Sequence, residues 1–95
     1  MAVYLIANVD VTDAAAYERY RAQVPATVEK YGGRFLVRGG RVEPLEGDYD
    51  PKRVVLLEFP SEERAKAWWN SPEYAPLMAL RRRASGGNLY FVTGV

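Results

Sequence analysis

Two segments of this chain are apolar on both faces of the strand that each of them predicts. Residues 3–6 and 54–57 contain no charged side chain, and successive side chains of a strand point to opposite faces of a sheet. A strand that is apolar on both sides needs a cover on both sides. A chain this short has helices for one cover only, so we expect a second copy of the same protein to supply the other.

Composition excludes several kinds of chemistry. The chain has 95 residues, which make one domain spanning 1–95, and it contains neither cysteine nor histidine. Disulfides, thiolate zinc sites, iron–sulfur clusters and histidine-held haem are therefore excluded, and the usual general base near neutral pH is missing. We expect no metal and no bound cofactor, so any reaction would rely on carboxylates, tyrosines, lysines or arginines.

Charge and hydropathy limit the partners. Thirteen basic residues stand against twelve acidic ones, so no broad positive field draws in a polyanion, and no nucleic-acid partner is expected. No segment approaches the ~20 apolar residues of a membrane span, and the first residues lack the pattern of a signal peptide. We therefore expect a cytoplasmic protein with no membrane partner.

The first half of the chain predicts a strand followed by a helix. The strand covers 3–11, and Thr12 then caps a helix that carries Asp13 in its first turn. Apolar residues recur every three or four positions as far as Tyr31, which places them on one helix face. Pro25 interrupts this pattern and predicts a kink or two shorter helices.

The second half predicts three strands and two helices. The strands cover 34–38, 53–59 and 88–93. A turn-rich surface connection over 41–51 leads into the middle one of these strands. Ser61 is the predicted cap of one helix, and Ser71, with Pro72 at the first helical position, is the predicted cap of the next.

This order of elements is typical of the ferredoxin-like βαββαβ sandwich, an α+β fold with its helices on one face of a sheet. The predicted sheet is four-stranded and antiparallel, with strand order 4-1-3-2. Within it, right-handed crossovers are expected to set the first and third strands side by side and parallel at the centre. These two strands are also the most apolar, which agrees with a central position.

One face of such a sheet has no helix to cover it. Whichever face the helices take, the other keeps three apolar pairs such as Tyr4 and Ile6, Val54 and Leu56, and Tyr90 and Val92. Burial of each side chain contributes ~1.5 to 3 kcal/mol, and a contiguous apolar patch marks an interface or a binding groove. The sequence therefore predicts a homodimer formed through the sheet face.

Several motifs resemble those of a known family. They occupy 32–40, 45–47, 58–61 and 67–74, followed by Arg81. The chain resembles domain-of-unknown-function family 1330, within the dimeric α+β barrel superfamily. The resemblance implies a ferredoxin-like protomer whose sheet packs on a partner's sheet, with a cleft between sheet and helices. The wider superfamily includes cofactor-free monooxygenases, lactone isomerases and haem enzymes, so the fold does not select a reaction.

Glu58 is the candidate catalytic residue. It follows four apolar residues near the end of a predicted central strand, where partial desolvation suits a carboxyl group to act as a general acid or base. The favoured alternative is a structural ion pair. Its predicted arginine partners are Arg34, Arg38, Arg53 or Arg81.

Seven further residues are candidate ligand-binding residues: Asn8, Tyr17, Tyr20, Arg38, Trp68, Tyr74 and Arg81. Arg81 shares a helix face with Tyr74 and would offer its guanidinium to a carboxylate ligand, or else complement the helix dipole together with its basic neighbours. The aromatic residues would line a pocket with phenol donors. The favoured alternative is that they complete the core with their polar tips at its edge.

The roles of Asn8 and Arg38 depend on the strand faces that they occupy. Asn8 lies on the Tyr4 side of its strand and would orient a ligand only if that face lined the cleft; otherwise it is an ordinary strand-end amide. Arg38 is expected to share a face with Arg34 and Leu36. From there it would reach a ligand, cross the dimer contact or protect the sheet edge.

Two functions remain open at this stage. One is a small dimeric protein that binds a small anionic or aromatic molecule in the cleft, with or without cofactor-free catalysis. The other is a noncatalytic dimerisation or regulatory module with a filled cleft. An RNA-recognition module has the same strand order but is rejected, because 54–57 lacks the exposed aromatic residues that stack on bases.

Overall fold

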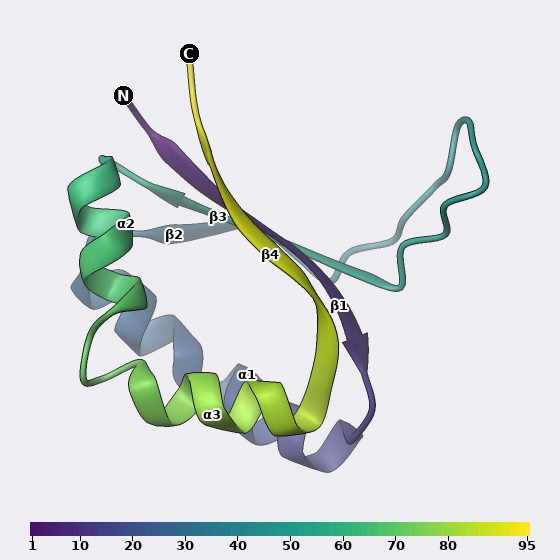
Figure 1. The fold of residues 1–95 in the computed structure, drawn as a ribbon, viewed down its shortest axis with the longest axis horizontal. Coiled ribbons are helices and arrows are strands. Elements are labelled where there is room, and N and C mark those ends of the chain that lie inside the picture. Colours follow the sequence, from purple (N-terminus) through teal and green to yellow (C-terminus); the bar gives the residue numbers. More distant parts are fainter.

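The computed structural model describes all residues from 1 to 95. Its elements are β1 (Val3–Val11), α1 (Ala14–Lys30), β2 (Arg34–Arg38), β3 (Arg53–Phe59), α2 (Glu62–Trp69), α3 (Ala75–Ala84) and β4 (Ser85–Thr93). The four strands form one sheet in the order β2-β3-β1-β4, and the helices lie together on one side of it (Figure 1). This is the ferredoxin-like α+β fold that the sequence predicts.

All three pairs of neighbouring strands are antiparallel. The expectation that β1 and β3 run parallel is therefore wrong. The right-handed crossover through α1 makes β1 parallel to β2 instead, and β3 lies between these two strands and runs against both.

The strand register divides the sheet into a covered face and an open face. On the covered face, Val3 and Leu5 of β1 lie opposite Phe59 and Leu57 of β3, and all four are at most 4 % exposed. The alternate residues of β1, β3 and β4 lie on the open face: Tyr4, Ile6, Asn8, Val54, Leu56, Glu58, Tyr90 and Val92. The open face thus carries the three apolar pairs that the sequence predicts for it.

A β-bulge in β2 reverses the orientation of the last residues of that strand. Arg34 lies opposite Glu58 on the open face, and the register then shifts between Phe35 and Val37. One extra residue moves every following side chain to the other face. Arg38 consequently points to the covered face, so the expectation that it shares a face with Arg34 is wrong.

Helix α1 is one continuous helix that contains Pro25, so the alternative of two shorter helices is wrong. Val24 and Val28 on either side of the proline are buried against the core. Their burial offsets the backbone hydrogen bond that the proline cannot donate. The N-cap is Asp13 rather than Thr12, and its carboxylate accepts a hydrogen bond from an amide of the first turn.

The second half of the chain follows the prediction with two differences. Ser61 caps α2 as expected, but Ser71 belongs to a turn, and α3 begins only at Ala75 with Tyr74 as its cap residue. β4 follows α3 directly from Ser85 and is longer than predicted. The loop between β2 and β3 extends away from the rest of the molecule (Figure 1). None of the three helices combines the length and the apolar composition of a membrane span.

Candidate functional site

A cavity lies between the covered face of the sheet and the helices. Its volume is about 30 Å³, which admits one or two water molecules, whereas a cavity that holds benzene measures about 150 Å³. Eleven of its fifteen lining residues are hydrophobic. The remaining four are all arginines: Arg21, Arg38, Arg53 and Arg81. The wall thus combines an apolar interior with positive charge and contains no acidic side chain.

Most of the predicted ligand-binding residues meet at this cavity. Its lining includes Tyr17, Tyr20, Arg38, Trp68 and Arg81. Tyr74 lies immediately behind the lining, in contact with the hydroxyl of Tyr20. The structure thus brings these side chains together around one space, and their roles in binding remain predictions.

Arg81, Tyr74 and Tyr20 form a buried chain of hydrogen bonds. The Nε–H of Arg81 donates to the Tyr74 hydroxyl over 3.2 Å, and the Tyr74 and Tyr20 hydroxyl oxygens are 2.9 Å apart. Burial, and next the neighbouring Tyr74, raise the pKa of Tyr20 far above its ordinary value. Tyr20 therefore keeps its proton at neutral pH and can act as a donor.

The guanidinium of Arg81 is buried without an acidic partner. The residue is 7 % exposed and takes part in none of the five ion pairs of the chain. Its guanidinium carbon lies 5.8 Å from the centre of the Trp69 ring, a cation–π contact that compensates only part of the lost hydration. Because its basic neighbours on α3 are exposed, Arg81 is the arginine of this cluster that turns inward.

Packed aromatic rings support Tyr74, the middle member of this hydrogen-bonded chain. The ring centres of Trp68 and Tyr74 are 4.1 Å apart, and those of Trp68 and Phe59 are 5.4 Å apart. The indole N–H of Trp68 donates to the hydroxyl of Thr27 over 3.0 Å. Trp68 is therefore a core residue with a satisfied polar atom, as the favoured alternative for the aromatic residues predicts.

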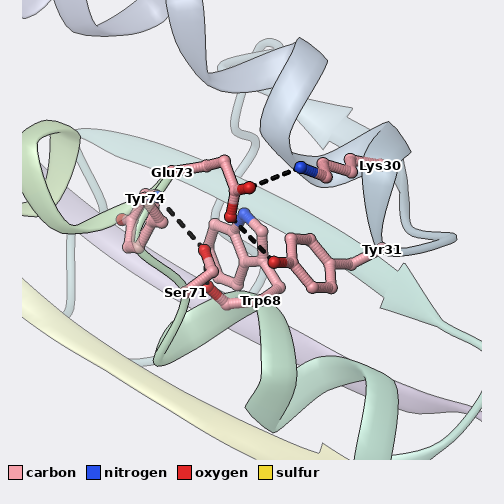
Figure 2. Close-up of polar contacts among 6 residues, drawn as sticks. All are labelled: Lys30, Tyr31, Trp68, Ser71, Glu73 and Tyr74. Carbon is pink, nitrogen blue, oxygen red and sulfur yellow. Dashed lines mark hydrogen bonds and ion pairs between the residues drawn. The ribbon is translucent and has the colours of Figure 1, made fainter.

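The turn between α2 and α3 positions Tyr74 (Figure 2). The Ser71 hydroxyl accepts a hydrogen bond from the Tyr74 amide over 3.1 Å. On the outer side of the turn, the carboxylate of Glu73 accepts a hydrogen bond from the Tyr31 hydroxyl over 2.8 Å and pairs with Lys30. These contacts fasten the turn to the end of α1 and thereby fix the backbone position of Tyr74.

The contacts of Glu73 predict a stability change in acid. The hydrogen bond from Lys30, and next that from Tyr31, lower the pKa of Glu73 from 4.5 to about 2. Because the folded state holds this carboxylate ionised, the contribution to stability is complete above pH 4.5 and is lost as pH falls toward about 2. We expect the melting temperature of Glu73→Gln to lie below that of the wild type at neutral pH and to approach it in acid. Glu63→Gln, at an exposed position outside the ion pairs, is the control, and a constant difference between Glu73→Gln and the wild type would contradict the assignment.

Glu58 and Asn8 do not line the cavity, because both lie on the open face of the sheet. The carboxylate of Glu58 accepts a hydrogen bond from Nε of Arg34 over 2.7 Å. This ion pair is the arrangement favoured for Glu58 from the sequence. A cavity shared by Glu58 and Arg81 is not formed, and a catalytic role of Glu58 stays a prediction that would require chemistry on the open face.

Arg21 and Arg53 line the cavity but were not predicted as ligand-binding residues. The signal for both is present in the sequence. Arg21 follows Tyr17 by four positions, which places it on the buried face of α1, and Arg53 alternates with Val55, which places it on the covered face of β3. For Arg53 this signal becomes decisive only once it is known which face of the sheet the helices cover.

Three solved structures show the same fold. RPA0582, a protein of unknown function from Rhodopseudomonas palustris, has a TM-score of 0.78 and 19% identity over 99% of this chain and 82% of its own. SnoaB, a cofactor-independent oxygenase from Streptomyces nogalater, has a TM-score of 0.67 and 15% identity over 99% of this chain and 93% of its own. Rv0793 from Mycobacterium tuberculosis has a TM-score of 0.61 and 18% identity over 100% of this chain and 96% of its own.

Identities this low establish a common fold and no common activity. No protein of curated function matches the chain in sequence. The family model described as "Domain of unknown function (DUF1330)" matches residues 2–95. The match spans nearly the whole chain, and the protein therefore belongs to the DUF1330 family.

Proposed function

We propose that this protein binds a small aromatic molecule in the cavity between sheet and helices, with an oxygen substituent directed at Tyr20. The observation that carries the proposal is the buried chain from Arg81 through Tyr74 to Tyr20. A cation at one end of a hydrogen-bonded chain polarises the hydroxyl groups along it, and these effects are stronger away from water. The open end of such a chain is suited to donate to a partly negative oxygen.

We extend the proposal to catalysis through an anionic intermediate, an enolate or phenolate whose proton passes to water, because the cavity lining contains no carboxylate or imidazole to accept it. Donors fixed in a dry site stabilise the charge that develops on an enolate or phenolate oxygen, and they need no reorganisation during the reaction. Tyr20 would donate to this oxygen, and Arg81 would supply the positive charge behind it. The likeness of the fold to SnoaB, described as a cofactor-independent oxygenase, supports a reaction that uses no bound cofactor.

Ligand entry in this proposal requires side chains at the solvent end of the cavity to move. The volume of about 30 Å³ is too small for an aromatic ring. Arg21, Arg38 and Arg53 are the partly exposed basic residues of the lining. Their long side chains can swing outward at the cost of a few rotamer changes, whereas Trp68 and Tyr74 are fixed by stacking.

The proposal is tested by titration with a neutral phenol, 4-hydroxybenzamide, followed by the intrinsic fluorescence of the tryptophans and by NMR. Loss of the Arg81 cation or of the Tyr74 hydroxyl leaves the Tyr20 hydroxyl less polarised, which weakens the hydrogen bond that it donates to the ligand. We expect weaker binding in Tyr74→Phe and in Arg81→Gln, each checked for its fold by circular dichroism. Tyr49→Phe deletes an exposed hydroxyl on the loop between β2 and β3 and should bind as the wild type does. Equal binding by all variants would overturn the proposal.

The small size of the cavity favours a second candidate function. In a noncatalytic dimerisation or regulatory module, the cleft would be filled by the protein's own side chains, and the hydroxyls of Tyr20 and Tyr74 would satisfy one another, as they do here. The same titration separates the two candidates, because a module of this kind would bind no aromatic probe at all. Both candidates include a homodimer, for which we propose the open face of the sheet as the contact.

A further inference from the structure

Three arginines from three elements converge at the solvent end of the cavity. Arg21 lies on α1, Arg38 on β2 and Arg53 at the start of β3, and all three belong to the cavity lining. Burial, and next the charges of Arg21 and Arg53, lower the pKa of Arg38. An acidic partner in the cluster would act in the opposite direction. The cluster is therefore a concentration of positive charge that the protein neutralises only in part, through the exposed Glu18.

The hydrogen bonds of these side chains are also incomplete. Only Arg21 forms an ion pair, with the exposed Glu18 at 3.2 Å. The Nε–H groups of Arg21 and Arg53 are buried, and no protein atom accepts a hydrogen bond from either. Arg38 donates to the main-chain carbonyl of Arg21, which places the Arg38 guanidinium beside the backbone of α1. Buried donors without acceptors lower the stability of a fold, so they call for an acceptor from outside the chain.

Two of the guanidinium groups lie against aromatic rings, and one of them also lies against a glycine. The guanidinium carbon of Arg38 lies 4.8 Å from the centre of the Phe35 ring, and that of Arg53 lies 5.2 Å from the centre of the Tyr17 ring. A Cβ atom at Gly39 would lie 2.5 Å from Nη1 of Arg53, so a larger residue there would displace the guanidinium from its present position. A guanidinium stacked on a ring keeps its N–H edge free, and that edge matches a carboxylate.

We propose that Arg21, Arg38 and Arg53 form an anion subsite that binds the carboxylate of an aromatic acid, whose ring enters the cavity. This inference rests on the function proposed above, because the ring is the part of the ligand that the cavity receives. The carboxylate supplies the acceptors that the buried N–H groups lack and neutralises the shared positive charge. It also draws the arginines away from the cavity mouth, which makes room for the ring.

The test compares two probes that differ in charge and little in shape, 4-hydroxybenzoate and 4-hydroxybenzamide, at constant ionic strength. The wild type should bind the carboxylate about tenfold or more tightly than the amide, as expected for charge-assisted hydrogen bonds. Arg53→Gln and Arg38→Gln should each remove most of this preference while still binding the amide. Arg19→Gln makes the same change of charge at an exposed position of α1 and should keep the preference.

Stability separates an anion subsite from a purely structural cluster. Removing one of three like charges is expected to leave the melting temperature of the ligand-free protein unchanged or higher, whereas loss of a needed stacking contact would lower it. Arg53→Lys keeps the positive charge but lacks the paired N–H groups of a guanidinium. It should recover only part of the preference for the carboxylate probe. If Arg53→Gln does not fold, Arg38→Gln and the amide shifts of Gly39 and Tyr17 in the wild type provide the same test, and unshifted amides overturn the subsite.

The outcomes also distinguish this inference from the proposed function. Equal affinity of the wild type for both probes would overturn the anion subsite and leave the aromatic site standing. A third outcome is that the wild type binds sulfate but neither aromatic probe, and that Arg53→Gln loses the sulfate. The three arginines would then remain an anion site, but the aromatic ligand and the proposed function would both be overturned. Loss of the preference in Arg19→Gln as well would show that net charge, and not this cluster, selects the ligand.

Discussion

Leu56→Asp is expected to convert the proposed homodimer into a monomer. Leu56 lies on the open face, in central strand β3 and opposite Ile6 of β1. In a symmetric dimer one substitution appears on both sides of the contact, so two carboxylates would lose water without a partner. The wild type should elute from size exclusion as a dimer at micromolar concentration, with light scattering as the measure of mass. Ala79→Asp adds the same charge on an exposed position of α3 and should stay dimeric.

The size of the expected effect follows from the apolar area of the open face. At its margins, Tyr90 is 47 % exposed and Val92 42 % exposed, while Leu36 and Val37 of β2 are 42 % and 37 % exposed. Full burial of such side chains contributes ~1.5 to 3 kcal/mol each, and partial prior burial reduces this. The sum is still several kcal/mol, a large share of the ~5 to 15 kcal/mol that stabilises a domain. A monomeric wild type with this face in solvent would refute the dimer.

The architecture was predictable because the spacing of apolar residues within each strand and helix is a local property of the sequence. The apolar side chains on both faces of β1 and β3 identified the central pair. Helical spacing placed Tyr17, Tyr20 and Val24 on one face of α1, where the structure buries them. The start of β4 was missed because glycines carry no side-chain pattern. Gly87 nevertheless pairs with Val9, and a Cβ on it would lie 2.0 Å from the Asn8 carbonyl oxygen.

The candidate site was harder to predict because it depends on which face of the sheet the helices cover. With apolar residues on both faces of β3, nothing local says whether even or odd positions face the helices. From the sequence, Glu58 and Arg53 were therefore equally good candidates for a position in the cleft. In the structure Arg53 lies on the covered face and Glu58 on the open face. Arg38 faces the cavity only because of the β-bulge before it. Residues 35–37 contain no glycine or other turn residue that would predict this bulge.

Trp68→Ala is expected to cause the largest loss of stability of any substitution discussed here. Trp68 is 1 % exposed, stacks on Tyr74 and Phe59, and donates its indole N–H to Thr27. Truncation of a fully buried tryptophan lowers the free energy of unfolding by ~3 to 5 kcal/mol, because it removes contacts and leaves a cavity. Urea denaturation followed by circular dichroism, at one protein concentration for all variants, measures the difference.

The neighbouring tryptophan supplies the matched control. Trp69 is only half-buried, and the centre of its ring is 6.3 Å from that of Phe91, so its truncation should lower the free energy of unfolding by much less. Trp68→Phe keeps a ring but loses the indole N–H, and should lie between the two alanine variants. If the free energy of unfolding of Trp68→Ala lies within about 1 kcal/mol of the wild-type value, then Trp68 does not stabilise the core as expected. Its position beside the cavity would then indicate a contact with ligand, and Tyr74 would need another support for the chain to Arg81.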